Sequence, residues 1–131
     1  MAMKNTAVLA FLLSLAGGIL VAQNDPVRLL MSKDLAGAAG KELSMLSVEY
    51  APGESTSAST HNAQAMVYVL EGSIVMQAKG KAPVTLTPGQ TWYEGPDDVH
   101  VVSRNASDSA PAKYLVFMVK DKGAPILTPV K

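Results

Sequence analysis

The sequence contains no cysteine, and this absence removes disulfides, thiolate metal ligands and cysteine nucleophiles from consideration. It also lacks an excess of charge of either sign, because eleven lysine and arginine side chains balance eleven aspartate and glutamate side chains. Binding to nucleic acid or to an anionic membrane surface calls for a clustered basic face, so the charge pattern argues against both partners. Without covalent cross-links, apolar burial must stabilise the fold.

Long apolar runs are also scarce, and the one that stands out, Ala7 to Ala22, follows the basic residue Lys4. It is short for a membrane span, and a basic residue before an apolar stretch of this length is typical of a secretory signal peptide. We therefore predict a signal peptide over residues 1–22 and a secreted or periplasmic protein without a stable membrane span in its mature form. An uncleaved amino-terminal anchor is the alternative.

After this run the sequence has the pattern of short strands, since no segment repeats the apolar spacing of a long helix. Leu46, Val48 and Tyr50, for example, alternate with polar residues. Residues 23–45 lack such a pattern and are predicted to form an amino-terminal arm, and residues 121–131 a carboxy-terminal tail. Short strands separated by Gly/Pro turns predict an all-β sandwich or barrel over residues 46–120. The predicted strands are 46–50, 66–70, 73–78, 84–87, 91–93, 99–102 and 113–120.

The chain has two histidines, and each lies in a frame of spaced glycines and polar residues. The first frame consists of Gly53, Ser59, His61, Ala65 and Gly72, and the second of Gly89, Gly95, Asp97, His100 and Asn105. With these spacings the chain resembles a small single-domain cupin, over about residues 47–119. The resemblance implies a cupin-like jelly-roll barrel of short antiparallel strands with a pocket inside.

Strand alternation indicates which side chains line that pocket. His100 is expected to begin the inward row of its strand, with Val102 next. Trp92 and Tyr93 are assigned to the core, because burial of aromatic side chains contributes strongly to stability. If the strand of the first frame continues without a bulge, its inward row is Ser59, His61, Ala63, Ala65, Val67 and Val69.

The resemblance implies that His61 and His100 are metal ligands, but the sequence departs from the metal-binding pattern of the family. In that pattern Ser59 would be a histidine and Ala65 the carboxylate, so two of four expected ligands are missing. Gln64 is a candidate replacement if a bulge turns it inward. Other polar side chains lie near the frames, although nothing in the sequence points them into the barrel: Glu54, Tyr93, Glu94 and Asp97.

Three function classes remain open. The chain is a module that binds a small-molecule ligand, a metal-dependent oxygenase or isomerase, or a metal-free structural barrel that has lost its site. Imidazole donors suit several divalent metals, and the candidates are Zn, Mn, Fe, Ni and Cu. A hydrolase triad built on Ser59 and His61 is disfavoured, because positions on one strand do not supply the serine-to-imidazole geometry or an oxyanion hole.

The strand that ends the first frame is apolar on its outer face as well. Met66, Tyr68 and Leu70 alternate with the inward row, where a solvent-exposed sheet would carry polar residues. Because the chain offers no helix as a cover, we expect either the arm or a second copy of the chain to cover this face. A homodimer is our hypothesis.

Overall fold

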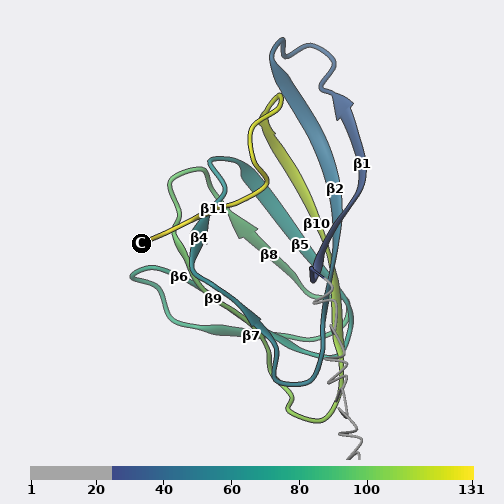
Figure 1. The fold of residues 1–131 in the computed structure, drawn as a ribbon, viewed down its shortest axis with the longest axis vertical. Coiled ribbons are helices and arrows are strands. Elements are labelled where there is room, and N and C mark those ends of the chain that lie inside the picture. Colours follow the sequence, from purple (N-terminus) through teal and green to yellow (C-terminus); the bar gives the residue numbers. More distant parts are fainter. Residues whose placement is uncertain (1–24) are drawn as a thin grey trace, which may run out of the picture.

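The structure is a computed structural model that describes residues 25–131, so the predicted signal peptide lies outside the described residues. These residues form two antiparallel sheets that face each other, without any helix (Figure 1). Accordingly, no helix within this range has the length and apolar character to cross a membrane. The prediction of an all-β barrel of short antiparallel strands is confirmed.

The two sheets differ in the length of their strands. The first has five strands, in the order β1 (Val27–Asp34), β2 (Lys41–Tyr50), β10 (Ala112–Asp121), β5 (Gln64–Glu71) and β8 (Thr91–Glu94). The second has the order β11 (Thr128–Pro129), β4 (Ser59–Thr60), β9 (His100–Asn105), β6 (Ile74–Ala78) and β7 (Val84–Leu86), and β3 (Ser55–Thr56) also pairs with β9. Each predicted strand has a counterpart here, whereas β1, β3, β4 and β11 were not predicted.

Both ends of the described chain contribute strands. β1 lies in the segment assigned to the arm and pairs with β2, so it extends the first sheet at its edge. It does not lie over the outer face of β5. β11 lies in the segment assigned to the tail and pairs with β4 of the second sheet. The folded unit therefore extends beyond residues 46–120 on both sides.

The core lies between the sheets and consists of the inward rows of their strands. Val69 and Ile74, on either side of the β5–β6 turn, have no exposed surface. The predicted inward row of the first frame is correct: His61 is partly buried, and the rest of the row is buried, namely Ser59, Ala63, Ala65, Val67 and Val69. This alternation survives a break between β4 and β5, where Asn62 adopts a positive φ of 45°.

The β5–β6 turn requires its glycine. Gly72 has a φ of 66°, a conformation that side chains other than glycine adopt only with strain. A Cβ at this position would also lie 2.3 Å from the carbonyl oxygen of Pro111. The turn therefore brings β5 close to the start of β10, and only glycine permits that approach.

A β-bulge corrects the prediction for the second frame. His100 pairs with Ala78 and Val102 with Gln77, so one extra residue of β9 lies between these two pairs. The bulge shifts the alternation, and Ser103 rather than Val102 follows His100 on the inward face. The Ser103 hydroxyl lies 2.7 Å from the Tyr50 hydroxyl and 3.2 Å from that of Tyr114.

The two aromatic residues of β8 occupy opposite faces of the sheet. Trp92 packs against the core, as predicted, whereas Tyr93 is 56% exposed and its assignment to the core was wrong. Tyr93 pairs with Met66, which is also exposed, on the outer face of the first sheet. None of the residues that the structure describes therefore covers the apolar outer face predicted for β5.

Candidate metal centre

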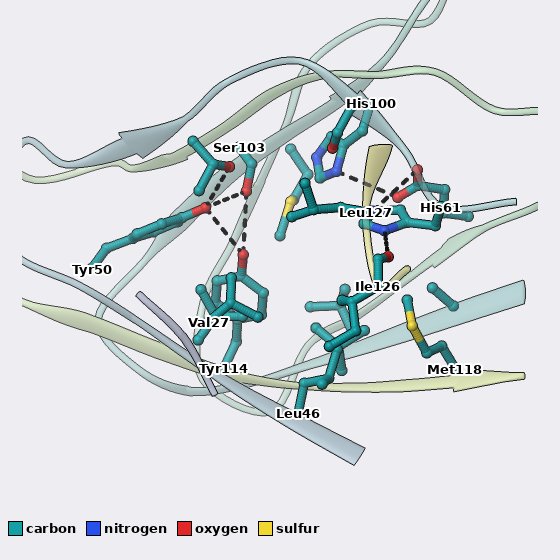
Figure 2. A pocket seen from close by; sticks show the side chains of 18 residues that line it. Val27, Leu46, Tyr50, His61, His100, Ser103, Tyr114, Met118, Ile126 and Leu127 are labelled. Atoms are coloured by element: carbon teal, nitrogen blue, oxygen red, sulfur yellow. Dashed lines mark hydrogen bonds and ion pairs between the residues drawn. The ribbon is translucent and has the colours of Figure 1, made fainter. Parts of the chain in front are cut away.

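The structure brings His61 and His100 together (Figure 2), and Glu94 adds a third potential donor. His61 lies between β4 and β5, His100 begins β9, and Glu94 ends β8. The donor atoms of the three side chains all lie within 4.8 Å of one another. Nε2 of His61 is 3.7 Å from Oε1 of Glu94, and Nδ1 of His100 is 3.4 Å from Oε2. Side chains from the β4–β5 connection, the end of β8 and the start of β9 thus converge on one point.

Glu94 occupies the space that the missing carboxylate would use. Glu94 pairs directly with Ala65 across the β5–β8 ladder, so the two side chains point to the same face. The small Ala65 side chain leaves room for the longer Glu94 side chain. Sequence reasoning noted Glu94 but could not orient it, because the inward direction depends on the register between β5 and β8. The available signal was that Glu94 lies two residues after the apolar Trp92, so the two side chains point to the same face of the strand.

The other sequence candidates do not supply donors to this group. Ser59 is buried and pairs with His100 across the β4–β9 ladder, but it is not one of the three converging donors. Gln64 is exposed, because no bulge occurs in this part of β5 and the residue keeps its outward direction. Glu54 accepts a hydrogen bond from the backbone of Ala51, which places its carboxylate in a turn.

Neighbouring groups orient both imidazole rings. Nδ1 of His61 lies 2.8 Å from the carbonyl oxygen of Ile126, and because a carbonyl only accepts, this nitrogen carries the proton. The lone pair of His61 is then on Nε2, the atom directed at Glu94. The ring of His100 packs at 5.1 Å from that of Trp92. Fixing the ring and tautomer through the second nitrogen is the arrangement found at histidine metal ligands.

Burial controls the electrostatics of the group. The side chains of His61, Glu94 and His100 are 15%, 3% and 9% exposed. Burial raises the pKa of Glu94 from 4.5 to about 7, with the Asp98 carboxylate adding to the rise and Lys81 opposing it. Burial also lowers the pKa of His100 from 6.5 to about 4. Near neutral pH the protein alone therefore disfavours charge on both Glu94 and His100.

The donor set fits a divalent metal ion. Within residues 25–131, Oε1 of Glu94 and Nε2 of His100 are buried without a hydrogen-bond partner, which is costly in a folded protein. Two donors bound to one ion at about 2.1 Å in tetrahedral geometry lie about 3.4 Å apart, close to the 3.7 Å between Nε2 of His61 and Oε1 of Glu94. Two imidazoles and one carboxylate are ligands of zinc and of non-haem iron. Glu94 thus supplies the negative charge that is missing at Ala65, where the metal-binding pattern has a carboxylate.

A small cavity of about 50 Å³ adjoins the three donors. At its other end, the hydroxyls of Tyr50, Ser103 and Tyr114 bond to one another (Figure 2). Its walls are mainly apolar, and they include Val48, Val67, Met76, Val116, Met118 and Ile126. A cavity of this size holds a few water molecules or a small ligand.

Comparison with known families agrees with the observed fold. The model of the cupin domain family Cupin_2 matches residues 46–118, which is more than half of the chain. No curated protein matches the sequence.

Several solved structures have a similar fold. The DMSP lyase DddQ from Ruegeria pomeroyi DSS-3 has a TM-score of 0.60 and 20% identity, over 67% of this chain and 43% of that protein. An oxalate oxidase in complex with the substrate analogue glycolate has a TM-score of 0.58 and 20% identity, over 67% and 46%. The Cupin_2 domain of an XRE family transcriptional regulator from Enterobacter cloacae has a TM-score of 0.54 and 24% identity, over 70% and 92%. The chain thus spans less than half of either enzyme.

Proposed function

This chain belongs to the cupin domain family. We propose that it binds a divalent metal ion through His61, Glu94 and His100, and that a small-molecule ligand binds to this ion. One observation carries the proposal: three potential donors from separate elements converge where a mainly apolar cavity ends. The ion is Zn, Mn, Fe, Ni or Cu, all of which accept imidazole or carboxylate ligands.

The unpaired polar atoms favour a metal site over a metal-free structural barrel. A barrel kept for its fold alone would gain stability from apolar residues at these positions. Instead, a carboxylate and an imidazole are buried with one atom each left without a partner. A divalent cation would compensate the charge of Glu94 and occupy the lone pairs of both histidines.

The cavity indicates the kind of ligand. Three protein donors leave coordination positions open for a ligand atom, as in catalytic metal sites. When bound, the metal would supply a Lewis acid to that atom. The apolar walls and the limited volume favour a small ligand with one oxygen or nitrogen for the metal and a short apolar body.

Two functions of the loaded site fit this description. Binding without chemistry makes the chain a ligand-binding module, and catalysis makes it an oxygenase or isomerase, as the resemblance implies. Among the similar structures, one is a lyase and one an oxidase. We also propose that residues 1–22 are removed as a signal peptide and that the chain is exported to the periplasm or the medium.

We further propose that the chain forms a homodimer through the outer face of its first sheet. A row of cross-strand neighbours runs over all five strands of that face, and we call it the outer row: Met31, Met45, Phe117, Met66 and Tyr93. Three of its members are more than half exposed. The arm does not cover them, which leaves a second copy of the chain. All five are uncharged, so two copies of the row would not repel each other in a symmetric interface.

Metal content of the purified protein tests the site. Wild-type chain from a bacterial host and the variants His61→Ala, Glu94→Gln and His100→Ala would be compared by mass spectrometry, before and after incubation with each candidate metal. We expect near-stoichiometric metal in the wild type and loss in all three variants. Gln64→Ala is the matched control, because Gln64 is exposed and should leave the metal content unchanged. A wild type that stays metal-free after incubation would refute the proposal.

A further inference from the structure

The segment after β10 crosses from the first sheet to the second (Figure 1). We call residues 124–130 the strap. Its far end is attached to β4, where Thr128 pairs with Thr60, and the N–H of Val130 donates to the carbonyl of Ala58 at 3.1 Å. The strap therefore closes one side of the space between the sheets.

A buried lysine holds the near end of the strap. The side chain of Lys120 is 4% exposed. Its Nζ forms an ion pair with Glu42 and donates to the carbonyl oxygen of Ala124 at 2.6 Å. Burying a lysine is costly unless it is paired and hydrogen-bonded. The fold thus places a buried cation where the strap begins, which fixes its starting point.

The middle of the strap contacts the candidate metal centre. The carbonyl of Ile126 accepts the Nδ1 proton of His61, and the side chains of Ile126 and Leu127 line the cavity (Figure 2). The strap thus sets the tautomer of a proposed ligand and forms part of the wall that a small molecule would contact.

The three donors are 15% exposed or less, so movement of a wall would widen the access of an ion or ligand to them. The strap is weakly attached to the second sheet. Its ladder with β4 has two residue pairs, whereas β10 and β2 are joined by ten. Segments with few backbone bonds open locally at the lowest free energy.

We propose that the strap is a movable wall of the site: in place, it orients His61 through the Ile126 carbonyl and narrows the cavity, and its opening widens access for metal and ligand. The second role rests on the proposed function, whereas the orientation of His61 exists without metal.

Removal of the strap tests the first role. A chain ending at Pro125 lacks the Ile126 carbonyl, and full-length Ile126→Ala keeps that carbonyl while shortening the side chain. In metal-free protein at pH 8, ¹⁵N NMR of histidine should show the Nδ1–H tautomer at His61 in wild type and Ile126→Ala. The shortened chain should lose this preference and bind Co²⁺ or Zn²⁺ about 10- to 100-fold more weakly. An unchanged tautomer in a folded shortened chain would overturn the assignment.

A full-length variant tests the second role even if the shortened chain does not fold. The chain has no cysteine, so Thr60→Cys with Thr128→Cys creates a single disulfide between directly paired residues. Release of bound metal to a chelator should be at least about 10-fold slower in the oxidised than in the reduced protein, because a locked strap cannot open. Equal release rates would overturn the movable wall. A wild type without metal would refute the proposed function and leave the tautomer experiment as the test of the strap.

Discussion

Glu94 has opposite effects on binding and on stability. As a carboxylate it supplies the negative charge that a metal between two neutral imidazoles requires. In the metal-free protein the same charge is buried without an adequate partner, which is why its pKa is raised to about 7. Residues that serve a binding site commonly reduce stability in this way.

The first prediction separates these two effects. Glu94→Gln should abolish metal binding and yet stabilise the metal-free protein at pH 8, by roughly 1–3 kcal/mol, because the substitution removes a buried charge at nearly constant volume. Urea unfolding of metal-stripped wild type and variant measures the difference. A variant less stable than the wild type would show that Glu94 has a structural partner in the folded state.

The pH dependence of stability gives the second prediction. The folded pKa of Glu94 is raised, so its penalty appears as the pH rises from 4.5 through about 7. The folded pKa of His100 is lowered, so its penalty appears as the pH falls from 6.5 through about 4. In the metal-free wild type the two slopes oppose each other between pH 4.5 and 6.5.

Single substitutions should expose each slope. Relative to wild type, Glu94→Gln should become more stable as the pH rises from 4.5 to 7, and His100→Gln should become less stable as the pH rises from 4 to 6.5. Unfolding midpoints over this range, each taken as a difference from the wild type, cancel the contribution of other titrating groups. Parallel slopes for both variants would contradict the assigned shifts.

At the scale of elements, the β5–β6 turn depends on a close approach between two strands. Gly72 and Gly80 both have positive φ, at 66° and 78°, but a Cβ at Gly80 would meet nothing within 4 Å. Gly80→Ala should therefore cost about 1 kcal/mol from backbone strain alone. Gly72→Ala should cost at least about 3 kcal/mol, because the added Cβ also collides with the Pro111 carbonyl. Equal unfolding midpoints for the two variants would contradict this account.

The sequence predicted the strands whose own pattern determines them. Alternation located β2 and β5 and placed His61 inward, because strand periodicity acts within a single segment. β1 and β11 were missed because they owe their structure to pairing with β2 and β4, and their own side chains show no clean alternation. Edge strands are stabilised by their neighbours more than by local pattern.

Part of the candidate site was predicted for the same reason, because local pattern indicates only what is determined within one segment. The glycine frames predicted that His61 and His100 line one pocket, whereas Glu94 needed the register of β8 against β5 to point inward opposite Ala65. The inward direction of Ser103 depended on the bulge in β9. Register and bulges are set by contacts between segments, which one sequence does not reveal.

At the scale of the whole molecule, the outer row lies on the face of the first sheet opposite to the core. Its five side chains form one continuous stripe, since each pairs with the next across a ladder. Contiguous apolar surface of this kind marks an interaction site on most proteins. A homodimer would bury it without disturbing the cavity, which lies on the other side of the sheet.

Charge within the outer row tests the dimer. Met66→Lys would place a cation in the interface of both copies, and it should weaken dimerisation at least about 100-fold. We expect the wild type to sediment as a dimer at micromolar concentration and Met66→Lys as a monomer with unchanged metal content. Val84→Lys is the matched control, because Val84 is an exposed apolar residue of the other sheet and should leave the dimer intact. A monomeric wild type, or dissociation by Val84→Lys alone, would rule out this face as the interface.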